Sequence, residues 1–151
     1  MLDHCKYKTK DMKSWSKTTY ILTLQKNLEK EEYEGKIELL FDFKIDDLPE
    51  KLNLVVEDGD RYKIKVNGKS IPVVPTNWWI DKCFKVIPLR NYKKGKNEIY
   101  LSINFKQPKK KNAHIYKENG VELETIYIKG KFSLGIKKTE FKSGGYFQDI
   151  F

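Results

Sequence analysis

The stretch 58–105 constrains the fold more than any other part of the chain. Tyr62–Val66 alternates apolar and charged side chains, the period of a strand with one face buried and one in water. Asn67-Gly68 follows at once and is the dipeptide that best tolerates the positive φ angles of a tight hairpin. Cys83–Leu89 and Glu98–Phe105 have the same strand-like character. The stretch therefore predicts three strand segments, connected by the Asn-Gly turn, a loop at Thr76–Lys82 that carries two tryptophans, and a Lys-Gly-Lys-Asn turn.

Further segments of the chain also have strand-like patterns. They are Thr18–Leu24, Lys36–Ile45, Leu52–Glu57, Val121–Ile128 and Phe132–Ile136. Asn27–Gly35 is expected to be a connecting loop, because it is too short to stand alone as a helix. Residues 1–17 are polar and expected to be irregular, and Pro88 favours an edge position for its strand. About seven or eight short strands in 151 residues predict one all-β domain, an antiparallel sandwich or barrel.

The net charge of +9 raises nucleic acid as a partner. Of the 30 basic residues, however, only Arg61 and Arg90 are arginines. Lysine supplies a point charge and lacks the bidentate fork that reads bases or clamps phosphates. The lysines are also scattered at alternate strand positions, as on solvated faces, and the run Lys109–Lys111 is expected to be an exposed loop tip. A nucleic-acid partner is therefore not favoured.

The two cysteines, Cys5 and Cys83, are too few for a disulfide framework or a four-cysteine zinc site. A single bridge between them stays open. Two reduced, buried thiols are the expectation, with Cys83 packed inside its strand.

No catalytic constellation is evident. The only histidines, His4 and His114, lie in loop-like segments outside any recognisable triad pattern. Acidic pairs occur at Asp46-Asp47 and at Asp58 with Asp60, where turn capping explains them. Loop carboxylates could also hold a structural calcium ion, but no Asp-x-Asp-x-Asp-Gly loop is present, so no metal or cofactor is predicted.

Trp78-Trp79 is the sharpest candidate for a binding surface. Adjacent residues of a strand point to opposite faces, so at most one of the two indoles can readily enter the core. The other could stack on a sugar ring, with Asn77, Asp81 or Arg61 available for hydroxyl groups. Docking against a neighbouring domain, glycan contact and packing within the domain all remain open.

The order of several motifs carries a resemblance that covers roughly residues 2–135. The motifs run strand, V-N-G, gap, D-x-x-F, strand and G-x-N. Here they are Leu2–Cys5, Tyr62–Lys69, Trp78–Phe84, Lys94–Ile99 and Glu122–Leu134. The chain resembles the galactose-binding-like (jelly-roll) β-sandwich domains of glycoside hydrolases. It is similar in particular to those of enzymes related to the family 2 β-glycosidases and to the α-L-rhamnosidases.

The resemblance implies a non-catalytic accessory domain, since in these enzymes the acid and nucleophile lie on a catalytic barrel. That barrel would be the partner, together with an oligo- or polysaccharide. Residues 1–17 would form a junction, 18–136 the sandwich, and 137–151 a segment leading into a longer protein. A stand-alone lysine-rich module that binds nucleic acid or protein is the alternative.

The compartment is not predicted. No apolar run approaches the ~20 residues of a membrane span, and the amino end has no signal-peptide pattern. We therefore expect no membrane partner. The cytoplasm and, for a fragment, secretion with the parent enzyme both stay open.

Overall fold

A computed structural model describes residues 1–108 and 120–132. Several sequence features lie outside these residues: Lys109–Lys111, His114, most of Phe132–Ile136, and 137–151.

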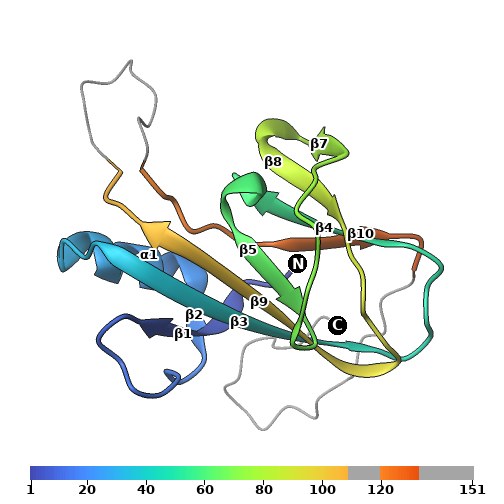
Figure 1. Cartoon of the computed structure of the whole chain (residues 1–151), viewed down its shortest axis with the longest axis horizontal. Helices are drawn as coiled ribbons and strands as arrows, with labels where there is room; N and C mark the ends of the chain where they lie inside the picture. The colour runs from blue at the N-terminus through green and yellow to red at the C-terminus, as the bar shows by residue number, and fades with distance from the viewer. Residues whose placement is uncertain (109–119, 133–151) are drawn as a thin grey trace, which may run out of the picture.

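Strands are the main regular elements of the described residues, beside one α-helix and one 3-10 helix (Figure 1). In order, the elements are β1 (His4–Thr9), β2 (Thr19–Tyr20), α1 (Ile21–Lys30), β3 (Gly35–Ile45), β4 (Leu52–Glu57), η1 (Gly59–Arg61), β5 (Lys63–Val66), β6 (Lys69–Ser70), β7 (Asn77–Trp79), β8 (Asp81–Pro88), β9 (Gly95–Phe105) and β10 (Tyr127–Gly130).

The strands form two antiparallel sheets. The six-stranded sheet has the order β2-β1-β3-β9-β5-β6, and the four-stranded sheet has the order β10-β4-β8-β7. One cluster of buried apolar side chains draws on both sheets and on α1. The predicted all-β sandwich is therefore confirmed.

The longest pairing joins β3 to β9, from Gly35 opposite Phe105 to Ile45 opposite Gly95. Alternation along both strands divides their side chains between two faces. The inner face contributes the buried Ile37, Leu39, Phe41, Ile99, Leu101, Ile103 and Phe105. The outer face is largely polar and charged, and this division sets where a polar ligand can approach.

The Asn67-Gly68 turn is confirmed. Both residues have positive φ, 50° and 78°, and they connect β5 to β6. The Asn67 side chain also donates to the Asn97 side chain at 2.9 Å. Asn97, almost fully buried, accepts from the Lys93 N–H at 2.8 Å and donates to the Gly95 carbonyl at 3.0 Å. The V-N-G and G-x-N motifs are thus one hydrogen-bonded unit.

The expected strand at Thr18–Leu24 is wrong beyond Tyr20, because the chain turns into helix α1 there. Ile21, Leu24 and Leu28 share the buried stripe of this ten-residue helix. Its N-cap, Tyr20, makes no side-chain capping bond, so the usual start signal is missing from the sequence. Among the described residues, no helix is long and apolar enough to cross a membrane.

Tertiary contacts override two further expectations. Residues 1–17 are not irregular throughout, since β1 pairs with both β2 and β3. Most of Val121–Ile128 is not a strand, because β10 begins only at Tyr127. The Leu123 N–H bonds instead to the Gln25 side chain at 2.8 Å, a helix contact that replaces a ladder bond.

Pro88 and Cys83 also differ from expectation. Strand β8 lies between β4 and β7, so it is not an edge strand. Pro88 is tolerated because β7 ends its pairing at Val86, which leaves Pro88 paired only with Asn53.

The thiols of Cys5 and Cys83 are both free, but only Cys5 is buried. Cys83 is exposed because its strand projects past the core there.

The two thiols should react at different rates. Burial raises the pKa of the Cys5 thiol to about 12, so its thiolate is scarce and shielded. Cys83 is exposed, although desolvation and the nearby Asp81 carboxylate raise its pKa too. We expect an aromatic disulfide reagent to titrate Cys83 in the folded protein and Cys5 only on unfolding. Equal rates in Cys5→Ser and Cys83→Ser variants would contradict the buried position of Cys5.

Substitution of Asn97 should destabilise the fold. Asn97→Ala removes the partner of the Lys93 N–H and of the Asn67 amide, which leaves polar groups without hydrogen bonds. Such a loss costs about 1–3 kcal/mol of unfolding free energy, measurable by urea denaturation. Asn104→Ala, at an exposed position of the same strand, is the control and should change it by less than about 0.5 kcal/mol. An equal effect of both would disprove the role given to Asn97.

Candidate functional site

The β7–β8 hairpin carries the tryptophan pair at the edge of the four-stranded sheet (Figure 1). Trp78 is 50% exposed and Ile80, at the turn, is 75% exposed. Ile80 also has a φ of 67°, a conformation that a β-branched residue rarely adopts. The turn therefore presents two large apolar side chains to water.

Trp79 has a different environment from Trp78. Its ring packs edge-on against Tyr127 of β10, with centroids 5.1 Å apart, and the Lys129 amine lies 5.7 Å from its centroid. Phe84 packs on the same tyrosine ring at 6.3 Å. Trp79 is thus a packing residue outside the main core, which leaves Trp78 as the accessible indole.

Asn77 and Asp81 flank the tryptophans and make local bonds. The Asn77 side-chain oxygen accepts from the Trp78 N–H at 2.8 Å. The Asp81 carboxylate accepts from the Cys83 N–H at 3.1 Å, and this backbone bond lowers the Asp81 pKa. Asp81 is therefore ionised at neutral pH and able to accept further hydrogen bonds from a ligand.

Arg61 is directed elsewhere. Its guanidinium donates to the Gly120 carbonyl at 2.7 Å and lies 3.7 Å from the Asp58 carboxylate. It lines a hollow on the outer face of the six-stranded sheet, and Trp78 is not among the residues around that hollow.

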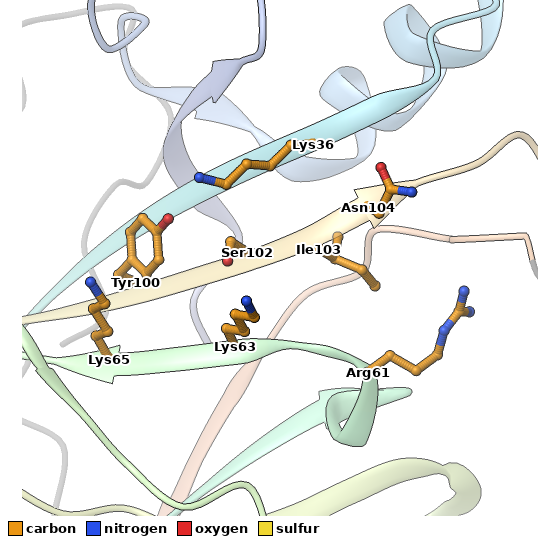
Figure 2. Close-up of a pocket in the computed structure, with 8 residues that line it drawn as sticks. All are labelled: Lys36, Arg61, Lys63, Lys65, Tyr100, Ser102, Ile103 and Asn104. Carbon is orange, nitrogen blue, oxygen red and sulfur yellow. The ribbon is translucent and has the colours of Figure 1, made fainter.

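The hollow has a volume of about 400 Å³ (Figure 2). Its lining combines four cationic residues with three polar ones and one apolar one: Lys36, Arg61, Lys63, Lys65, Tyr100, Ser102, Asn104 and Ile103. The lysine side chains gather around Tyr100 and Ser102, whereas Arg61 points away from them. This is a second candidate binding surface, separate from the tryptophan hairpin.

Two residues that line the hollow, Tyr100 and Lys36, share one carboxylate partner. Glu38 accepts from the Tyr100 hydroxyl and from the Lys36 amine, the latter at 3.0 Å. The Tyr100 hydrogen bond, followed by that of Lys36, holds the Glu38 pKa below its usual value. The bond to Glu38 in turn raises the Lys36 pKa. Both groups are therefore charged at neutral pH.

The Tyr100 ring is covered on two sides. The Lys65 amine lies 5.4 Å from its centroid, and the Trp15 ring packs edge-on against it at 6.4 Å. Trp15, from the connection between β1 and β2, therefore packs on the outer face of the six-stranded sheet beside Tyr100. The ring is fixed by these contacts and by its hydroxyl bond, so it is positioned before any ligand arrives.

Metal-ligand side chains do not gather in groups of three or more within the described residues. The two acidic pairs noted in the sequence make local contacts. Asp46 lies 2.6 Å from the Lys44 amine, and Asp58 forms the ion pair with Arg61.

The lysine-lined hollow is the feature that the sequence analysis missed. Within their own segments, Lys36, Lys63 and Lys65 fit the pattern of a solvated strand face. Alternation puts each of them on a polar face, but only the pairing of β3, β9 and β5 shows that this face is shared. The period-2 pair Lys63 and Lys65, and the pair Lys6 and Lys8, were the available signal.

Comparison with known proteins adds no family to this picture. No protein-family model matches the chain, and no curated protein matches it.

The pH dependence of stability should report the Glu38–Tyr100 bond. The pKa of Glu38 is lower in the folded protein than in the unfolded chain, where it is ~4.3. The ionised carboxylate therefore stabilises the fold fully above the unfolded pKa, and this stabilisation is lost as pH falls through the folded pKa. Tyr100→Phe removes the donor. We expect the loss of unfolding free energy relative to the wild type to be larger at pH 7 than at pH 3. Denaturation at both pH values checks this, and a pH-independent difference would contradict it.

Proposed function

We propose that the chain is a non-catalytic accessory β-sandwich module of a carbohydrate-active enzyme, contacting glycan through the β7–β8 hairpin. The observation that carries this proposal is the half-exposed indole of Trp78 at a sheet edge. An indole is flat and apolar, so it can stack on the C–H face of a sugar ring. The neighbouring Asn77 and Asp81 side chains supply polar groups for sugar hydroxyls.

The fold and the linked motifs support this proposal. Two antiparallel sheets fit the architecture of galactose-binding-like (jelly-roll) domains. The Asn67–Asn97 bond gives a structural reason for the V-N-G and G-x-N motifs to occur together. In glycoside hydrolases of this kind the acid and nucleophile lie on another domain. The role proposed for this chain is to bind the glycan and position it for the catalytic domain.

The protein partner that this function implies is the catalytic domain of the same enzyme. Ile80 is apolar and 75% exposed at the hairpin turn, two residues from Trp78, and a domain contact would bury it. A natural gene product that encodes a catalytic barrel in the same chain would support this partner. A natural gene product that encodes the sandwich alone would contradict it.

Retention in polysaccharide gels tests the glycan contact. Native electrophoresis through gels with soluble neutral polysaccharides, such as galactomannan, xyloglucan and mixed-linkage β-glucan, should retard the wild type in at least one of them. Trp78→Ala should weaken that retention about tenfold or more, which corresponds to ~1.4 kcal/mol of lost stacking. Since Trp78 is half exposed, the fold should persist, and unfolding curves verify this.

Tyr20→Ala is the matched control. Tyr20 is a 39% exposed aromatic residue at the edge of the other sheet. Its removal should leave retention unchanged. Failure of every neutral polysaccharide to retard the wild type, or equal losses in the Trp78 and Tyr20 variants, would rule out a glycan contact at the hairpin.

A further inference from the structure

Strand register gathers lysines on the outer face of the six-stranded sheet. One row across β1, β3, β9 and β5 runs Lys8, Glu38, Ser102, Lys63. The next row runs Lys6, Leu40, Tyr100, Lys65. Directly opposed residues share a face, so each row begins and ends with a lysine. The two rows form a floor of mixed polarity between two cationic walls.

The spacing of these walls follows from sheet geometry. Same-face residues of one strand are about 7 Å apart, so Lys63 and Lys65 form one such pair and Lys6 and Lys8 the other. Three strand intervals separate the walls, about 14 Å at ~4.8 Å each. The hollow of about 400 Å³ lies on the Lys63–Lys65 side (Figure 2). These dimensions suit an extended polymer chain better than a single small ion.

The face has excess positive charge. Across the two rows, four lysines are present against one carboxylate, Glu38, and Glu38 is engaged by Lys36 and Tyr100. Lysines placed this close repel one another, and a concave surface concentrates their field. An anionic ligand relieves this repulsion, so the ligand class is acidic.

The floor distinguishes between acidic polymers. The Tyr100 ring already has the Lys65 amine and the Trp15 ring packed against it, so a nucleobase would have to displace one of them to stack there. The ionised Glu38 can accept hydrogen bonds from hydroxyl groups, which a uronate ring carries and a phosphodiester link lacks. The Ser102 hydroxyl and the Asn104 amide provide further partners for hydroxyls. A polymer with both carboxylates and hydroxyls fits this face better than a nucleic acid.

We propose that the outer face of the six-stranded sheet, centred on Lys63, Lys65 and Tyr100, binds a carboxylated polysaccharide, a polyuronate. Its carboxylates pair with the wall lysines, and its hydroxyls bond to the floor. The inference rests on the proposed glycan-binding function but uses a different surface from the β7–β8 hairpin.

Binding of polygalacturonate tests the proposal, with its methyl-esterified form as the matched neutral ligand. Affinity electrophoresis and calorimetry on the full chain should show retention by the acid form and none by the ester. Lys63→Gln with Lys65→Gln should weaken binding of the acid form about tenfold or more. Loss of binding with added salt is expected as well, because exposed charges are screened.

A second double variant controls for net charge. Lys26→Gln with Lys30→Gln removes the same charge from exposed positions of α1. It should change the affinity less than about twofold. Equal weakening in both double variants, equal binding of the ester, or no binding of polygalacturonate by the wild type would overturn the proposal.

Competition separates the other polymer class and the other surface. A single-stranded oligonucleotide that displaces polygalacturonate and binds more tightly, with the same dependence on Lys63 and Lys65, would overturn the proposal in favour of nucleic acid. Trp78→Ala should leave polygalacturonate binding intact. Retention by polygalacturonate but not by neutral polysaccharide gels would rule out only the glycan contact at the hairpin. Retention by neutral polysaccharide gels but not by polygalacturonate would rule out only the site on the lysine-lined face.

Discussion

The pairing of β3 with β9 is the constraint on which the rest of the sandwich depends. Eleven residues of each strand lie side by side, and both neighbours of this pair, β1 and β5, take their register from it. A slip of one residue would reverse the faces, placing Lys36 in the core and Phe41 in water. The apolar inner face and the cationic outer face are therefore two consequences of one register.

The two candidate surfaces belong to different sheets and have different chemistry. The β7–β8 hairpin offers an accessible indole at an edge of the four-stranded sheet. The outer face of the six-stranded sheet offers fixed positive charge around a positioned tyrosine, Tyr100. The two surfaces share no residue, so a ligand on one would leave the other accessible.

Local patterns predicted those parts of the fold in which period and burial agree. Lys36–Ile45 and the Asn67-Gly68 turn were predictable, because alternation and positive φ are encoded within a few residues. Helix α1 was not, because it starts without a capping side chain after a β-branched run, and its stability comes from the core and from the Gln25 contact to residue 123. The lysine-lined face was also hidden, since pairing between distant strands is absent from any local pattern.

The left-handed backbone of Ile80 is a costly conformation for an isoleucine. Asparagine or glycine adopts its left-handed backbone more easily, and either would expose less apolar surface. A turn optimised for folding alone would carry one of them. Isoleucine lowers the stability of the isolated sandwich, and natural proteins tend to keep such residues where activity, not stability, is under selection. Position 80 is thus a point at which an engineer could stabilise the sandwich, at the expense of the contact proposed for the hairpin.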